Sequence, residues 1–167
     1  MLEQELDEIK KEHQTLPDVL LKEFERRTAR RKSLVVRGFP EATEGSVEER
    51  RESDEDKLKK LLDSMELTDI KVRNVTRIGK SRSDGKRLLK FSTECKDDRR
   101  RILKNASSLR DSGDYRTVFI GADLTPRQQE SERLLRKEVK ERRDKGEDVV
   151  IYKGAVQTRT KKRENFQ

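Results

Sequence analysis

Residues 34–39 read Leu-Val-Val-Arg-Gly-Phe and are followed by Pro40. A short aliphatic run that ends in Gly, Phe and Pro is typical of a β-strand that stops at a turn. Apolar residues that alternate or cluster between polar, turn-forming segments predict further strands. These are expected over residues 70–78, 88–91 and 117–120.

Two helices are expected between these strands. Ser53 with Asp56 marks the start of the first helix, which should end near Leu67. The second is expected over residues 95–109, with Ile102 on its inner face. The resulting order, β-α-β-β-α-β, is the split βαβ arrangement, in which two helices pack on one face of an antiparallel sheet and the other face stays open.

The N-terminal residues 1–32 carry apolar side chains in alternating steps of four and three, which is a heptad pattern. Pro17 interrupts the pattern, and Thr15 is a candidate cap for a second helix behind it. Two interpretations stay open: an oligomerising coiled coil, or an amphipathic helix folded onto its own domain. The positions expected to form the oligomer seam are Leu2, Leu6, Ile9, Leu16 and Leu20.

The C-terminal part begins with Thr125-Pro126, a cap followed by a first-turn Pro, which predicts a long helix to about Lys145 that Gly146 closes. Val149 to Gln157 predicts a last strand or hairpin. The expected class is therefore α+β. Its four parts are a helical segment at 1–32, the split βαβ domain at 33–122, a helix and strand at 123–159, and a basic disordered tail at 160–167.

The composition favours an anionic partner. Of 167 residues, 46% are charged and 29% hydrophobic, and the formal net charge is +8. Residues 41–69 hold 5 Lys/Arg against 11 Asp/Glu, whereas residues 70–110 hold 14 against 4 and residues 126–167 hold 13 against 8. Basic charge gathered in this way attracts phosphates, which release counterions when Lys and Arg neutralise them.

Enzymatic chemistry is not expected. The chain has one Cys and one His, Cys95 and His13, which are too few for an internal disulfide or a zinc site. His13 belongs to the expected N-terminal helical segment and Cys95 follows an expected strand without a His partner, so no nucleophile–base pair is expected. No metal or cofactor is expected. No apolar run approaches a membrane span, which predicts a soluble intracellular protein.

Six stretches, in this order and spacing, resemble the first-open-reading-frame proteins of LINE-type non-LTR retrotransposons. They are Leu34–Glu41 (LVVRGFPE), Val75–Gly79 (VTRIG), Leu88–Phe91 (LLKF), the Arg110 turn (LRDSG), Ala122–Thr125 (ADLT) and Val150–Tyr152 (VIY). The resemblance implies a coiled coil, an RNA-recognition motif (RRM) and a small C-terminal domain. It further implies a trimeric, sequence-tolerant single-stranded RNA-binding protein and nucleic-acid chaperone. Such a protein would act in ribonucleoprotein particles in the cytoplasm, with the nucleus as a second location and single-stranded DNA as a second ligand.

Standard RRMs stack bases on aromatic side chains of the first and third strands. Here the corresponding positions are Val35, Lys86 and Leu88, so phosphate contacts are expected to supply most of the affinity. The single-stranded nucleic acid is expected to lie in a cleft between the RRM and the C-terminal segment. The candidate binding residues are Arg37, Arg73, Arg77, Lys86, Lys90, Arg110, Arg133, Arg136, Lys137, Lys140 and Tyr152.

Several alternatives remain open from the sequence. Arg110 has Asp111 and Asp114 as candidates for a local salt bridge, and Tyr152 is as well suited to filling a core as to stacking on a base. The Lys and Arg residues on the expected strands are also compatible with solvated charges at the edge of a sheet that binds no ligand. The competing function is a structural or oligomerisation module whose atypical RRM binds protein instead of nucleic acid.

Overall fold

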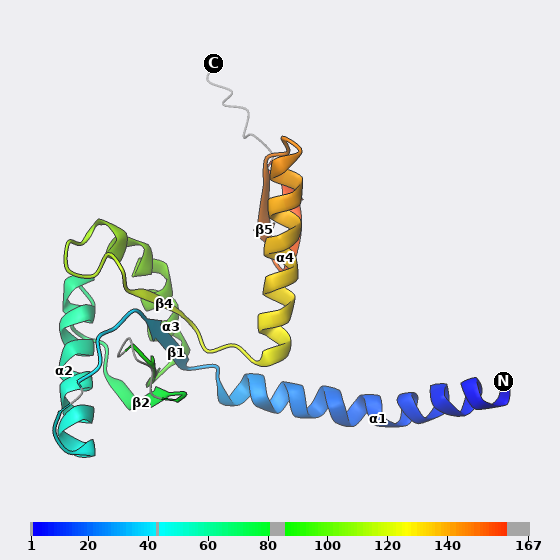
Figure 1. Ribbon diagram of the computed structural model, residues 1–167, viewed down its shortest axis with the longest axis horizontal. Helices are drawn as coiled ribbons and strands as arrows, with labels where there is room; N and C mark the ends of the chain where they lie inside the picture. The colour runs from blue at the N-terminus through cyan, green and yellow to red at the C-terminus, as the bar shows by residue number, and fades with distance from the viewer. Residues whose placement is uncertain (1, 43, 81–85, 160–167) are drawn as a thin grey trace. The chain divides into compact units, whose positions relative to one another are not determined.

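The computed structural model describes the backbone of residues 2–42, 44–80 and 86–159, and side chains from residue 15 onward within those ranges. The chain forms two compact units, residues 1–123 and 124–167. Figure 1 shows the helices and strands along the chain. The tail expected at 160–167 lies outside the described residues.

The first element, α1, is one helix from Leu2 to Ala29. The expected break at Pro17 is wrong, because the helix continues on both sides of this residue. A Pro inside a helix removes one backbone hydrogen bond, and here the turns before and after it continue regardless. Leu2, Leu6 and Ile9 belong to α1, but their side chains lie outside the described part of the chain.

Four strands form one antiparallel sheet with the order β2-β3-β1-β4. Their bounds are Ser33–Arg37 (β1), Val72–Ile78 (β2), Leu88–Thr93 (β3) and Phe119–Ala122 (β4). The expected order β-α-β-β-α-β is confirmed. The last strand lies two residues later than predicted, because Val118 enters a turn in which its N–H donates to the Tyr115 carbonyl.

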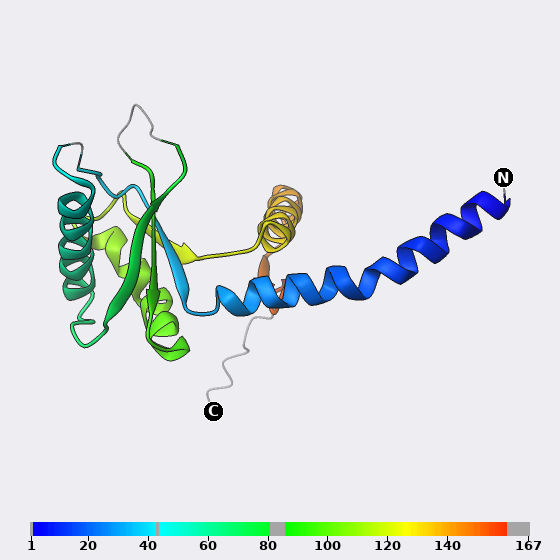
Figure 2. The same ribbon diagram turned by 90° about the horizontal axis from the view of Figure 1, so that it is seen from below.

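Two helices cover one face of this sheet, as Figure 2 shows. They are α2 (Val47–Ser64) and α3 (Lys96–Asn105), and α3 continues as a 3-10 turn, Ala106–Asp111. The strands contribute alternate residues to the core between the layers, among them Leu34, Val36, Leu89 and Phe91, and the helices contribute Leu58, Leu61, Leu62 and Ile102. The opposite face of the sheet therefore carries the intervening residues.

The start of α2 differs from the expectation at Ser53. Ser46 caps the helix: its hydroxyl accepts a hydrogen bond from the Glu49 N–H at 3.1 Å, and the Glu49 carboxylate accepts one from the Ser46 N–H at 2.7 Å. This reciprocal capping box satisfies two helix-end donors, and Glu48 and Glu49 in the first turn complement the positive end of the helix dipole. The helix therefore begins at Val47, before the expected start at Ser53.

The second unit contains α4 (Pro126–Asp144) and a two-stranded hairpin of β5 (Val149–Tyr152) and β6 (Ala155–Thr158). The predicted cap at Thr125 is confirmed, and Gln128 completes a second capping box. Gly146 follows the helix with φ +87°, a conformation that favours Gly at a helix end. Within this unit Val149 is fully buried, whereas no residue of α4 is, so the apolar contact between helix and hairpin is narrow.

Candidate functional site

The open face of the sheet is the first candidate surface. Because β1 buries Leu34 and Val36, its other side chains, Val35 and Arg37, lie on the face away from the helices. Pairing across the ladders places Lys90 beside Val35, and Phe119 beside Arg37. The open face therefore combines cationic, aliphatic and aromatic groups.

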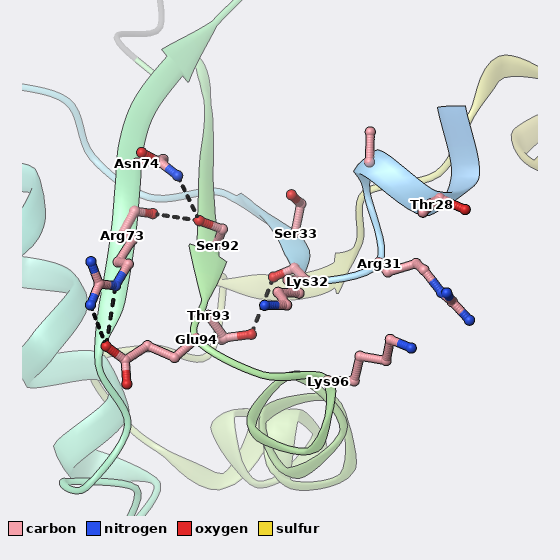
Figure 3. A pocket seen from close by; sticks show the side chains of 11 residues that line it. Thr28, Arg31, Lys32, Ser33, Arg73, Asn74, Ser92, Thr93, Glu94 and Lys96 are labelled. Carbon is pink, nitrogen blue, oxygen red and sulfur yellow. Dashed lines mark hydrogen bonds and ion pairs between the residues drawn. The ribbon is translucent and has the colours of Figure 1, made fainter. Parts of the chain in front are cut away.

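One end of this face is hollowed. A cavity of about 630 Å³ lies where α1 ends and β1, β3 and α3 meet, and Figure 3 shows the side chains around it. Four of the lining residues are cationic and one is anionic. The full lining is Thr28, Ala29, Arg31, Lys32, Ser33, Arg73, Asn74, Ser92, Thr93, Glu94 and Lys96. We call this region the basic hollow.

The wall of the basic hollow on β2 and β3 is tied together by polar contacts. Arg73 donates to the Glu94 carboxylate at 2.5 and 3.2 Å, and this pair holds the pKa of Glu94 below its usual range. Asn74 donates to the Ser92 hydroxyl at 3.1 Å, and Ser92 donates to the Arg73 carbonyl. Arg73, an expected binding residue, is thus on the open face, but Glu94 already neutralises its charge.

Three further cations of the basic hollow form no ion pair of this kind. Among the described residues, Arg31, Lys32 and Lys96 have no carboxylate within ion-pair distance. Figure 3 shows the side chains of Arg31 and Lys96 extending away from the Arg73–Glu94 pair. Lys96 is also the first residue of α3, where the helix dipole adds positive potential. Sequence reasoning did not single out these three residues, although the run Arg30-Arg31-Lys32 before the first strand is a signal that could have found two of them.

Asp123 is the carboxylate that balances the nearby cations of this surface. It is 8% exposed, and its oxygens lie 3.4 Å from Arg30 and 2.8 Å from Lys90. Arg99 donates to the Ser33 carbonyl at 3.2 Å, and burial lowers the pKa of this guanidinium while Asp123 opposes the change. Lys90, expected to bind the ligand, therefore lies on the open face with its ammonium engaged by Asp123.

The expectation for Arg77 requires correction. Its side chain is 6% exposed and lies on the helix side of the sheet, where it forms a bidentate ion pair with Asp54 of α2 at 2.6 and 2.9 Å. It also donates to the carbonyls of Phe39, Pro40 and Arg87. The cause is a register shift in β2 between Arg73 and Thr76, beside Asn74 with φ +53°. Arg77 is a structural residue that joins β2, α2 and the segment after β1.

Three further expected residues of this unit are exposed. Arg37 ends β1, Lys86 precedes β3, and Arg110 lies in the 3-10 turn after α3. The alternative of a salt bridge from Arg110 to Asp111 or Asp114 is absent from the described part of the chain. Arg110 remains a candidate for a phosphate contact.

Sequence reasoning missed Phe119. Its side chain is 55% exposed, on the same face as Arg37. Strand alternation could have found it, because Val118 and Ile120 are the apolar residues that contribute to the core, which leaves the residue between them to point outward.

The second unit carries a separate surface, a groove of about 520 Å³ between α4 and β5. Four expected binding residues lie on α4, three of them already paired. Arg133 pairs with Glu130 at 2.6 Å, Arg136 with Glu132 at 2.9 Å, and Lys137 with Glu141 at 3.7 Å. Lys140 lines the groove beside Arg136 and Arg143 and has no carboxylate partner among the described residues. Lys140 is therefore the one of these four expected binding residues whose charge is least neutralised by a neighbouring carboxylate.

Tyr152 on β5 is exposed, with 54% of its surface accessible, so its interpretation as a core residue is wrong. The ammonium of Lys153 lies 5.3 Å from the centroid of its ring, within cation–π distance. An accessible aromatic ring with a neighbouring cation has the features of a stacking site.

No protein-family model matches this chain, and a search of curated proteins found no significant match. Within the described ranges, no helix is long and apolar enough to cross a membrane. The same ranges contain no group of three or more His, Cys, Asp or Glu placed to hold a metal ion.

Proposed function

We propose that this chain is a sequence-tolerant single-stranded nucleic-acid-binding protein of the retrotransposon ribonucleoprotein type, with RNA as its ligand. The observation that carries the proposal is the basic hollow, which Arg31, Lys32 and Lys96 line and where, among the described residues, none of the three forms an ion pair. A hollow lined by more cations than carboxylates has a positive potential, which attracts phosphates.

The sheet supports an RRM-like interpretation of the first unit. Its order, β2-β3-β1-β4, and its two helices on one face leave the opposite face open for a ligand, the arrangement that RRMs use. The positions at which a standard RRM stacks bases are Val35, Lys86 and Leu88 here, so contacts to phosphates dominate. Binding is therefore sensitive to salt and largely indifferent to sequence.

The test is the affinity for a single-stranded RNA of mixed sequence, measured by fluorescence anisotropy between about 50 and 300 mM salt. We expect a linear fall of log affinity with log salt, with a slope of about −0.7 for each phosphate contact. Combined substitution of Arg31, Lys32 and Lys96 by Ala should reduce the slope by about 2.

The matched control replaces Arg51, Lys59 and Lys60 of α2 by Ala, which removes the same charge from a helix that covers the other face of the sheet. It should change the slope far less. Equal effects of the two triple variants would show that only net charge matters, and a flat salt dependence of the unmodified protein would contradict the phosphate-contact model.

The second candidate function is an oligomerisation module whose sheet binds protein. One observation favours it: Leu16, Val19, Leu20, Leu21 and Phe24 of α1 are each about half exposed or more. The first unit therefore leaves these side chains of α1 largely uncovered. Light scattering combined with RNA binding separates the two functions, because an oligomer that does not bind RNA at low salt would favour the second.

A further inference from the structure

The end of the open face opposite the basic hollow carries an aromatic ring beside a guanidinium. β1 runs from Ser33, which lines the hollow, to Arg37, which pairs with Phe119 across the β1–β4 ladder. Both side chains are exposed and share the face away from the helices. Among the described residues, Arg37 has no ion-pair partner.

The fold does not require an aromatic residue at position 119. A Phe stabilises a protein when its ring is buried, and this ring is 55% exposed while Val118 and Ile120 supply the core contacts of the same segment. A shorter polar residue would fill this edge-strand position equally well and would cost less exposed apolar surface.

The surroundings of the ring leave room for a planar ligand. Gly121 is two residues along β4 on the same face, and nothing lies within 4 Å of the position that a Cβ would take there. Across the sheet, Ile78 pairs with Leu88 on this face, and both are partly exposed. Because the strand order is β2-β3-β1-β4, Arg37 lies between Phe119 and these two residues, with an apolar group on either side of it.

Charge complementarity identifies the kind of occupant. On the same face, the five residues of β1 separate Arg37 from the cations of the basic hollow by about 13 Å. A ligand that covers both ends must offer flat apolar groups at one end and negative charges at the other. Single-stranded nucleic acid does so, because each nucleotide carries a base with a π-face and a phosphate.

We propose that Phe119 and Arg37 form a base-stacking site, in which one base lies against the Phe119 ring and the Arg37 guanidinium lies beside it. This site rests on the function proposed above and extends it from phosphate contacts to a contact with the base. It differs from the stacking positions of a standard RRM, which correspond to Val35, Lys86 and Leu88. Stacking of this kind is tolerant of sequence, because every base has a π-face.

The first experiment uses the absence of Trp from the chain. The substitution Phe119→Trp places a single Trp at the site, and titration with a single-stranded RNA should quench the Trp emission with the same midpoint as anisotropy gives. Val47→Trp is the control, because Val47 is an exposed residue of α2, which packs on the other face of the sheet. Its emission should stay unchanged.

The second experiment compares an ordinary oligonucleotide with an abasic one of equal length, which keeps the phosphates and lacks the bases. Phe119→Ala should weaken binding of the ordinary strand roughly fivefold or more, the lower end of what one aromatic–base contact supplies. It should leave binding of the abasic strand and the salt slope unchanged, and Phe119→Tyr should retain affinity. Val47→Ala, which removes an exposed apolar side chain from α2, is the matched control. Circular dichroism verifies that each variant is folded.

The outcomes separate the two proposals. An unmodified protein that does not bind RNA at low salt overturns the proposed function. An unmodified protein that binds, with Phe119→Trp unquenched or Phe119→Ala as tight as wild type, overturns the stacking site alone. If the emission of the Phe119→Trp variant shifts with protein concentration in the absence of RNA, this face binds protein, which also overturns the stacking site.

Discussion

Arg77 and Asp54 form a buried bidentate ion pair in which both side chains are less than a tenth exposed. Arg77 uses every one of its donor nitrogens: two hydrogen bonds reach the Asp54 carboxylate, and three reach backbone carbonyls of Phe39, Pro40 and Arg87. One side chain thereby fixes α2, the start of β3 and the segment after β1.

We predict that Arg77→Ala lowers the free energy of unfolding by about 3–5 kcal/mol, because it leaves the Asp54 charge buried without a partner. Arg77→Lys should recover only part of the loss, since an ammonium cannot replace the five-donor fork. Urea denaturation gives the values. Arg73→Ala is the control: its ion pair with Glu94 is exposed and screened by solvent, so its removal should change stability little. A similar loss in both variants would refute the structural role given to Arg77.

Gly38 has a backbone conformation and a close contact with Thr117 that a larger residue could not adopt. Its φ is +79°, and a Cβ at this position would lie 2.2 Å from the carbonyl oxygen of Thr117. Gly38→Ala should therefore destabilise the first unit by at least about 2 kcal/mol, through the backbone conformation and the steric clash together. Gly113→Ala is the control, because nothing lies within 4 Å of its Cβ position and its φ is ordinary. Thermal unfolding compares the two variants.

Acid stability should depend on the Glu41–Arg87 pair. Hydrogen bonds from Arg87 hold the pKa of Glu41 below its ordinary value of 4.5, and burial opposes this only in part. A carboxyl group with a lowered folded-state pKa contributes stability that is complete above pH 4.5 and is lost as the pH falls through the folded-state value. Glu41→Gln should therefore reduce stability at pH 7 and flatten its decline below about pH 4.5. An equally steep decline in this variant, measured by urea denaturation from about pH 3 to 7, would assign the acid sensitivity to other carboxylates.

The sequence predicted much of the fold, because hydrophobic alternation and helix caps are local signals. The four-stranded order and the cap at Thr125 follow from such patterns. The start of α2 was also readable, since Ser46 and Glu49 have the spacing of a capping box, but Ser53 with Asp56 offered a competing signal. Choosing between two local signals requires the tertiary contacts that only the folded chain provides.

The candidate site was harder to predict, for two physical reasons. Arg73 and Arg77 are four residues apart and should share one face of a regular strand, but the irregularity at Asn74 turns Arg77 to the opposite side. Pairing is the second reason: Arg73, Lys90, Arg133 and Arg136 each lie near a carboxylate, and the sequence alone does not show which cations are neutralised. Arg31 and Lys32 belong to a basic run that the sequence shows, but their grouping with Lys96 follows only from the arrangement of the elements around the basic hollow.

The exposed apolar side chains of α1 predict self-association. Leu16 and Leu20 are each about half exposed and lie four residues apart, at neighbouring positions of one helix face. Burying such a face between copies of the chain removes apolar surface from water, about 25 cal/mol for each Å². Leu16→Glu combined with Leu20→Glu should therefore reduce the mass measured by light scattering to that of the monomer, 19.7 kDa.

The control for this prediction is Lys22→Glu combined with Arg26→Glu, which places two new carboxylates on α1 at the same spacing but replaces residues that are already charged. It should leave the mass unchanged. Because oligomerisation multiplies the number of RNA-binding surfaces that engage one strand, the Leu16/Leu20 variant should also lose affinity for a long RNA while it keeps its affinity for a short oligonucleotide. A monomeric mass for the unmodified protein at all concentrations would contradict the prediction, and loss of short-oligonucleotide binding in the variant would show that α1 contributes to the binding site itself.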